Sequence, residues 1–216
     1  MDRIRKFNRN LSGRDFVCGD IHGCYDKLMA GLEKIHFNKT VDRLFCCGDL
    51  VDRGPDSVKC MSLVYEDWFF SVRGNHEIMM YDALYGQNEN DHTLWIQNGG
   101  LWVYEEDPNT VKLIVDDVLT KMPYAIEVHT SDGNIGIIHA EVPYNDWSAL
   151  SDERFNEERC VWARTRIKSK DTSHVKNIDR VYVGHTIVRN PITLGNVHYI
   201  DTGAFRDDGT LSIVEI

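Results

Sequence analysis

The chain has 216 residues, of which 42% are hydrophobic, and its formal net charge is −10. This length suits one domain with a substantial core, so we predict a single domain over residues 1–216. An acidic chain offers little of the basic surface that nucleic acids and anionic membranes require, so we expect neither as a partner. No apolar run in the sequence approaches the ~18 residues of a membrane span.

The N-terminal residues and the cysteines indicate a reducing compartment. Met1–Asn10 is polar and basic and lacks the apolar segment of a secretory signal. The six cysteines include no Cys-x-x-Cys pair. Cys18, Cys46 and Cys47 fall inside predicted strands, where a thiol behaves as a small apolar group. We therefore expect reduced thiols and a cytoplasmic protein.

Strands and helices alternate along the first third of the chain. The apolar patterns predict strands over Arg14–Gly19, Arg43–Gly48 and Trp68–Val72, and helices over Cys24–Ile35, Asp56–Tyr65 and from Glu77 to Tyr85. A β-α-β-α-β-α order implies a largely parallel sheet with helices packed on it.

The rest of the chain is helical and then rich in strands. Helical patterns cover Leu94–Tyr104 and Thr110–Lys121, and strands are predicted over Tyr124–Thr130, Asn134–Ile138, Arg180–Val183, His198–Ile200 and Leu211–Ile216. A turn over residues 131–134 favours a hairpin between the first two of these strands. The predicted fold class is α/β, with two packed sheets and outer helices.

Three motifs with metal-binding side chains directly follow the first three strands. They are Gly19-Asp20-Ile21-His22-Gly23, Gly48–Gly54 with Asp49, Asp52 and Arg53, and Arg73-Gly74-Asn75-His76-Glu77. The carboxyl ends of parallel strands are where open α/β sheets bind ligands, so we expect the three motifs to meet at one edge.

Two strand-end histidines extend the candidate metal ligands. His139 and His185 each end a predicted strand beside small residues, and histidine is the commonest metal ligand. The ligand set becomes Asp20, His22, Asp49, Asn75, His139 and His185. Asp49 could bridge two metals about 3.5–4 Å apart, and a water shared by such metals has a lowered pKa and becomes a nucleophile.

With these motifs, nearly the whole chain resembles the metallophosphoesterase superfamily and, within it, the PPP-type serine/threonine protein phosphatases. The small bacterial and lambda phage phosphatases are the most similar, and Val161–Arg164 and Tyr199–Gly203 add to the likeness. The resemblance implies a calcineurin-like catalytic domain with two mixed β-sheets packed as a sandwich and flanked by helices. It implies hydrolysis of phosphoserine and phosphothreonine on proteins, with phosphotyrosine left open.

The resemblance also assigns roles to individual residues. One metal takes Asp20, His22 and Asp49, and the other takes Asp49, Asn75, His139 and His185. His76 is the general acid and Asp52 its orienting partner. The phosphate is held by Arg53, Arg73 and Arg164. Because the ligand set holds no thiolate, two ions of Mn²⁺ are expected, with Fe²⁺ or Zn²⁺ as alternatives.

One departure from the eukaryotic members limits what the resemblance implies. Ile200-Asp201-Thr202-Gly203 stands where they carry Ser-Ala-Pro-Asn-Tyr, and we expect no regulatory tail. We therefore expect phosphorylated proteins as partners and no eukaryotic-type regulatory subunit. Two other functions stay open: a symmetrical dinucleoside tetraphosphatase, which shares these motifs, and a metal-bound binding module without turnover.

Overall fold

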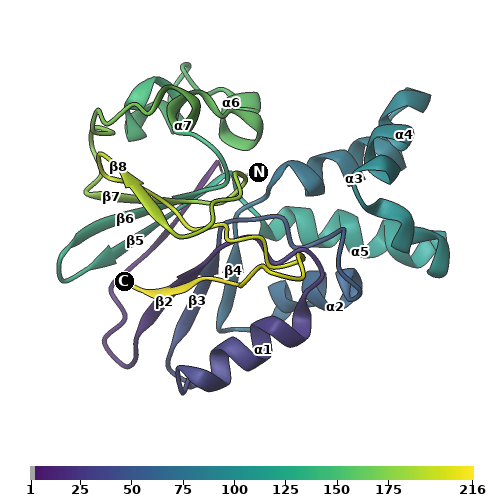
Figure 1. Ribbon diagram of the computed structural model, residues 1–216, viewed down its shortest axis with the longest axis horizontal. Coiled ribbons are helices and arrows are strands. Elements are labelled where there is room, and N and C mark those ends of the chain that lie inside the picture. Colours follow the sequence, from purple (N-terminus) through teal and green to yellow (C-terminus); the bar gives the residue numbers. More distant parts are fainter. Residues whose placement is uncertain (1–2) are drawn as a thin grey trace.

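The computed structural model describes residues 3–216 as two mixed β-sheets packed face to face (Figure 1). The motif sheet has the order β10-β2-β3-β4, and its strands are Ile213–Glu215, Asp15–Cys18, Arg43–Cys46 and Phe69–Ser71. The large sheet has the order β1-β5-β6-β7-β9-β8, with strands Ile4–Phe7, Ala125–Thr130, Gly133–Ile138, Arg180–Val183, Val197–Tyr199 and Ile192–Leu194.

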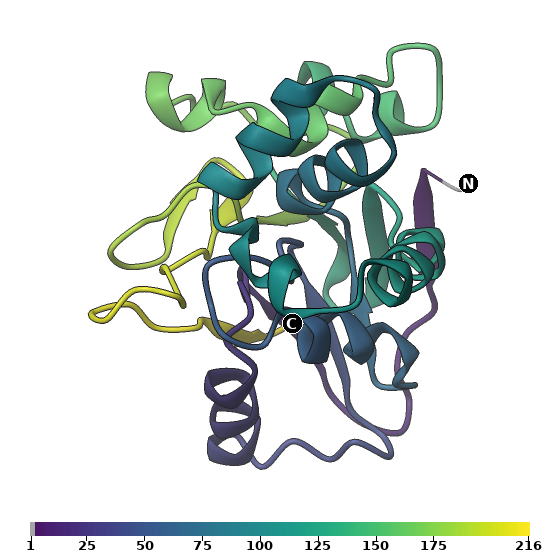
Figure 2. The same cartoon turned by 90° about the vertical axis from the view of Figure 1, so that its right-hand side faces the viewer.

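Seven helices of the described chain flank the two sheets. They are α1 Tyr25–Lys34, α2 Ser57–Ser62, α3 Asn75–Tyr85, α4 Glu89–Gln97, α5 Pro108–Lys121, α6 Glu157–Trp162 and α7 Thr165–Ser169. Short 3-10 turns lie at Leu63–Tyr65, Gly100–Glu105, Pro143–Asn145 and Trp147–Leu150. Figure 1 shows α1 outside the motif sheet and α6 and α7 outside the large sheet. Figure 1 also shows α3, α4 and α5 at the right-hand end of the sandwich, which is the side that faces the viewer in Figure 2.

Within residues 3–216, no helix is both long and apolar enough to cross a membrane.

Side-chain alternation along the strands explains the sandwich. In β2, Val17 belongs to the core between the two sheets, whereas Phe16 and Cys18 belong to the core under α1, α2 and α5. In β7, Tyr182 faces the core between the sheets, and its neighbours Val181 and Val183 face α6. Because successive side chains of a strand point to opposite faces, each sheet contributes to two cores.

The predicted fold class is confirmed. Strands β2, β3 and β4 are parallel, and β10 joins β2 antiparallel. The predicted helix Leu94–Tyr104 is wrong in one respect, because the α-helix ends near Gln97 and a 3-10 turn begins at Gly100. Gly99 between them has φ of 116°, a left-handed conformation that interrupts the helix. The elements β1, β8, α6 and α7 were not predicted.

Candidate metal centre and active site

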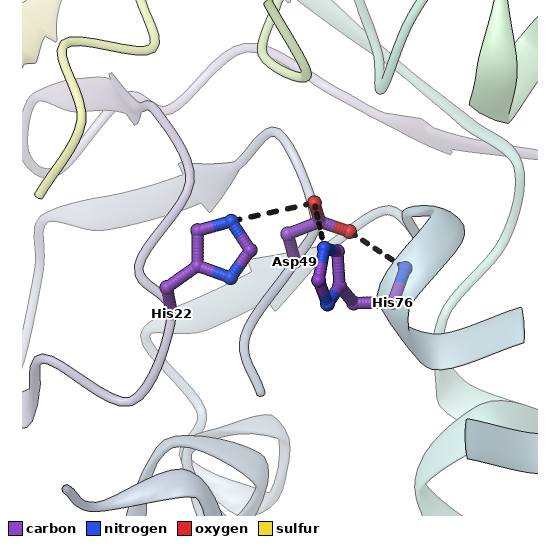
Figure 3. A group of neighbouring side chains, drawn as sticks. All are labelled: His22, Asp49 and His76. Atoms are coloured by element: carbon purple, nitrogen blue, oxygen red, sulfur yellow. Dashed lines mark hydrogen bonds and ion pairs between the residues drawn. The ribbon is translucent and has the colours of Figure 1, made fainter. Parts of the chain in front are cut away.

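Asp49 lies at the centre of a buried group of imidazoles (Figure 3). Its Oδ2 is 3.6 Å from His22 Nε2, 3.5 Å from His139 Nε2 and 3.9 Å from His76 Nε2. Its Oδ1 accepts the backbone N–H of His76 at 3.0 Å. Burial acts to raise the pKa of Asp49, but the three imidazoles outweigh it and hold that pKa below its ordinary value. Asp49 is therefore a carboxylate that faces three imidazoles, and its role as a bridge between two metals stays a prediction.

Asp20 brings a second carboxylate to the same place. Its Oδ2 accepts the backbone N–H of His185 at 2.9 Å, and its buried Oδ1 has no hydrogen-bond partner within residues 3–216. Burial raises the pKa of Asp20, and the nearby carboxylates of Asp201 and Asp49 raise it further. A buried oxygen without a donor, next to other carboxylates, is suited to a cation.

Three lone pairs converge on the other side of Asp49. His139 Nδ1 donates to the carbonyl of Cys47 at 2.7 Å, which leaves Nε2 as an acceptor. This Nε2 faces Asn75 Oδ1 at 2.9 Å and His185 Nδ1 at 3.2 Å. Because His185 Nε2 lies 3.1 Å from the carbonyl of Trp162, its proton belongs there and its Nδ1 is also an acceptor. Three acceptors that face one another are suited to hold a cation between them.

His22 is the last of the predicted metal ligands. Its Nδ1 donates to the carbonyl of Val51 at 2.9 Å, and the acceptor Nε2 meets Arg53 Nη1 at 2.7 Å. The Arg53 guanidinium thus occupies the lone pair of His22 Nε2 that a metal ion would otherwise bind. Burial lowers the pKa of both His22 and His185 to about 3, so both rings are neutral at pH 7 and able to bind a metal. The residues present therefore fit a dinuclear site.

His76 and Asp52 form a buried pair beside these ligands. His76 Nδ1 lies 2.6 Å from Asp52 Oδ2, and its Nε2 has no hydrogen-bond partner in the described chain. Burial lowers the pKa of His76, but the carboxylates of Asp49 and Asp52 outweigh it, so the pKa is raised above its ordinary value. The ring is therefore protonated more readily than a free imidazole, and Nε2 is the atom that no described residue engages by a hydrogen bond.

The three arginines differ in placement. Arg53 reaches His22 and lies 4.7 Å from the ring centroid of Phe205. Arg164 donates to the carbonyl of His185 at 3.2 Å and is half-buried.

Arg73 is buried. It donates to the carbonyls of Met122 and Leu119 at 2.8 and 2.7 Å, and its guanidinium lies 4.6 Å from the centroid of the Tyr124 ring. These contacts tie the start of the third motif to the α5–β5 connection, so the role of Arg73 as a phosphate ligand stays a prediction.

The motif loops have unusual backbone geometry. Ten non-glycine residues of the described chain have positive φ, and the site contributes five of them: His22, Asp49, Asp52, Arg53 and His185. Each costs about 1–2 kcal/mol relative to ordinary backbone conformations. At two glycines the missing side chain leaves room for a carboxylate of the site. A Cβ on Gly184 would lie 1.9 Å from Asp20 Oδ1, and a Cβ on Gly74 would lie 2.0 Å from Asp49 Oδ1.

Sequence reasoning assigned no role to several residues that hold the site. The buried Glu77 carboxylate accepts backbone N–H groups from two motifs. A glutamate three residues after a helix start is a capping signal that could have indicated it. The indoles of Trp95 and Trp102 donate to Asp52, and Asp201 lies beside Asp20. No local signal predicts these contacts, because the partners are far apart in the sequence.

An α/β sandwich whose strand ends gather carboxylate, amide and imidazole ligands defines a candidate dinuclear metal enzyme. The family model described as calcineurin-like phosphoesterase matches residues 16–197, and the chain belongs to this family.

Two curated relatives from bacteria agree with this assignment. Serine/threonine-protein phosphatase 1 of Salmonella typhimurium is 36% identical over 193 residues, which cover 88% of this chain and 86% of that protein. Serine/threonine-protein phosphatase 2 of the same organism is 34% identical over 221 residues, covering 99% and 98%. The predicted likeness to bacterial phosphatases of this class is therefore confirmed.

Dinucleoside tetraphosphatases are also similar, over a shorter stretch of sequence. The symmetrical bis(5'-nucleosyl)-tetraphosphatase of Wigglesworthia glossinidia brevipalpis is 39% identical over 88 residues, which cover 38% of this chain and 32% of that protein. A solved structure described as a candidate diadenosine tetraphosphatase superposes with a TM-score of 0.69 at 20% identity, covering 100% of this chain and 94% of that chain. This superposition shows that the two chains share a fold.

Proposed function

We propose that this chain is a phosphoprotein phosphatase that hydrolyses phosphoserine and phosphothreonine. The observation that carries the proposal is the placement of His76, whose Nδ1 is held by Asp52 while its buried Nε2 lies beside Asp49 without a hydrogen-bond partner among the described residues. Long-coverage similarity to two bacterial serine/threonine-protein phosphatases supports the protein substrate.

Two divalent ions would be held by the predicted ligands, one by Asp20, His22 and Asp49 and the other by Asp49, Asn75, His139 and His185. When bound, they supply a nucleophilic water at neutral pH and offset the charge of the phosphate. The oxygen and imidazole donors favour Mn²⁺, with Fe²⁺ or Zn²⁺ as alternatives.

The protein's own groups supply orientation and the proton. Arg53 and Arg164 approach the ligands His22 and His185 from two sides, and we assign them to the phosphate oxygens. Water attacks phosphorus as the ester P–O bond breaks, and His76 Nε2 gives its proton to the departing serine oxygen. Asp52 holds the ring by Nδ1 and stabilises its positive charge. The products are inorganic phosphate and the free hydroxyl group.

A symmetrical dinucleoside tetraphosphatase is the second candidate, because similarity to that class covers 38% of the chain. It needs the same ligands and acid but a site that accepts a polyphosphate between two nucleosides. A phosphoserine peptide and diadenosine tetraphosphate, assayed side by side, separate the two. A preference for the dinucleotide would replace the protein-phosphatase proposal.

The test of the proposed function starts from purified protein. After chelation and removal of the chelator, a phosphoserine peptide, a phosphotyrosine peptide and an aryl phosphate are assayed with and without Mn²⁺. We expect no turnover without metal and restored turnover of phosphoserine with Mn²⁺. Full activity in a verified metal-free sample would contradict the dinuclear mechanism. Failure to hydrolyse any phosphate ester would favour a binding module. The cytoplasmic location and the absence of a regulatory subunit stay predictions.

A further inference from the structure

Asp52 is held by two tryptophan side chains as well as by His76. Trp95 Nε1 donates to Asp52 Oδ1 at 3.0 Å and to Oδ2 at 3.1 Å, and Trp102 Nε1 donates to Oδ1 at 2.8 Å. Asp52 and Trp95 are fully buried. The indole rings pack edge to face, with centroids 5.9 Å apart.

These donors hold both oxygens of the Asp52 carboxylate. Oδ1 receives both indoles, and Oδ2 lies 2.6 Å from His76 Nδ1 and also accepts from Trp95. An indole N–H only donates and cannot carry a proton onward. The two tryptophans therefore fix the rotation of the Asp52 carboxylate and offset its charge, but they take no part in proton transfer themselves.

The backbone between Trp95 and Trp102 also approaches the loop that carries Asp52 and Arg53. Gly99 accepts the N–H of Arg53 at 3.3 Å, and a Cβ on Gly99 would lie 2.7 Å from Arg53 N. Leu101, beside Trp102, is 61% exposed, whereas the Trp102 indole turns inward to Asp52. The segment from Trp95 to Trp102 thus covers the Asp52 side chain and contacts the backbone of Arg53 from outside the motif loops.

We propose that Trp95 and Trp102 are positioning residues for proton donation, acting on His76 through the Asp52 carboxylate. The proposal rests on the proposed function, in which His76 protonates the leaving oxygen. Loss of either indole N–H removes part of the set of hydrogen bonds that fixes the carboxylate, so His76 is less well held in the donor orientation. The effect then depends on how much the leaving group needs its proton.

The test compares Trp102→Phe with the matched control Trp147→Phe. Trp147 is also buried and donates to a carboxylate, Glu127 Oε2, at 2.9 Å, but in the core of the large sheet. Both proteins are assayed at saturating Mn²⁺, with bound metal measured. Trp102→Phe should lower kcat on a phosphoserine peptide about tenfold, the effect expected for a hydrogen bond to a charged group. The loss should be smaller on an aryl phosphate, with KM nearly unchanged, and the control should show neither effect.

A double-mutant cycle separates positioning from general structural support. In an Asp52→Asn background, Trp102→Phe should cost nothing further in kcat, because the charge through which it acts is gone. Equal losses on the two esters, or a tenfold loss that persists in the Asp52→Asn background, would overturn the proposal. Trp95→Phe provides a second variant if Trp102→Phe does not fold.

A spectroscopic readout keeps this proposal separate from the proposed function. The indole N–H signals of Trp95 and Trp102 should lie downfield in the NMR spectrum of the wild-type protein and move upfield in Asp52→Asn. Signals that do not respond to Asp52→Asn would overturn the positioning role even in an active phosphatase. A wild-type protein that hydrolyses neither ester would instead reject the proposed function.

Discussion

The carboxylate of Glu77 accepts the backbone N–H of Asp49, with 3.0 Å between Glu77 Oε2 and Asp49 N. The same oxygen accepts the N–H of Gly74 at 2.7 Å, and Oε1 accepts the N–H of Leu50 at 2.7 Å. Glu77 is fully buried. One side chain from the third motif therefore sets the backbone of the second, at the residue that the two metals would share.

Glu77→Ala should weaken both folding and metal binding. It leaves three buried N–H groups without their acceptor, and each such group costs about 1–3 kcal/mol. We expect the free energy of unfolding to fall by about 3 kcal/mol or more. Urea titration and metal titration measure the two effects. Glu77→Gln keeps an acceptor oxygen and should lose less stability and less metal affinity than Glu77→Ala. An unchanged midpoint of urea unfolding in Glu77→Ala would contradict this role of Glu77.

Asp49→Asn should be the most damaging change to a single ligand. It removes the carboxylate that faces three imidazoles and that we assign to both metals. Metal content by mass spectrometry should fall below two ions per chain, and turnover should fall with it. His198→Ala, outside the site, is the control. Two tightly bound ions and a near-normal rate in Asp49→Asn would exclude a bridging role.

His76→Asn should leave metal binding intact while lowering kcat by about 10²–10⁴, the usual contribution of a general acid. KM should change little, because the proton is needed mainly in the transition state. The deficit should be smaller on an aryl phosphate than on a phosphoserine peptide. If both esters lose equally while chemistry limits the rate, His76 binds phosphate and does not donate the proton.

Arg164 and Arg166 should respond differently to removal, although only one residue separates them. Arg166 is buried and donates to the carbonyls of Asp171, Ser173 and Leu194. Arg166→Ala should therefore lower the free energy of unfolding by about 2–4 kcal/mol. Arg164→Ala should leave stability nearly unchanged and raise KM for the phosphate ester. Thermal unfolding and steady-state kinetics of both variants check this, and the reverse pattern would reassign the phosphate arginine.

Asp146 should contribute stability that disappears in acid. Side-chain hydrogen bonds from Arg154, then Asn177 and Ser148, hold the pKa of this carboxyl below its ordinary value. A depressed folded-state pKa stabilises the fold above the unfolded pKa and loses that effect as the pH falls towards the folded-state value. Asp146→Asn should therefore cost about 1 kcal/mol at pH 7, and the difference from wild type should shrink below about pH 4.

Urea unfolding at several pH values tests this expectation. Asp132→Asn, in the exposed turn between β5 and β6, should show no such trend. A deficit in Asp146→Asn that stays constant from pH 7 to pH 3 would mean that the Asp146 charge does not stabilise the fold.

Local patterns were sufficient to predict the motif sheet and its helices. The periodic apolar residues of α1 and the buried runs of β2 and β3 follow from burial on one or both faces. β1 escaped prediction because Arg5 and Lys6 occupy half of its four residues. It exists through parallel pairing with β5, which lies more than a hundred residues away. The helices α6 and α7 span six and five residues, too few to show a helical period.

The identity of the candidate ligands could be predicted from local sequence, but their orientation could not. Each ligand lies within or beside a short sequence signal, because strand ends and glycine turns place it locally. The ligands His139 and His22 are oriented by the distant carbonyls of Cys47 and Val51. Asp52, which is not a ligand, is oriented by the indole of Trp102. Such contacts depend on how the two sheets and the α4 region pack, which no single segment encodes.

The close approach of Gly184 to Asp20 and of Gly74 to Asp49 has a consequence for protein engineering. At both positions a single methyl group would overlap a carboxylate oxygen, at 1.9 and 2.0 Å. At these two contacts the main chain itself sets how closely the carboxylates are packed, so no side chain can be introduced there without displacing Asp20 or Asp49. An attempt to change which ion the protein prefers would therefore leave both glycines in place and exchange donor atoms instead.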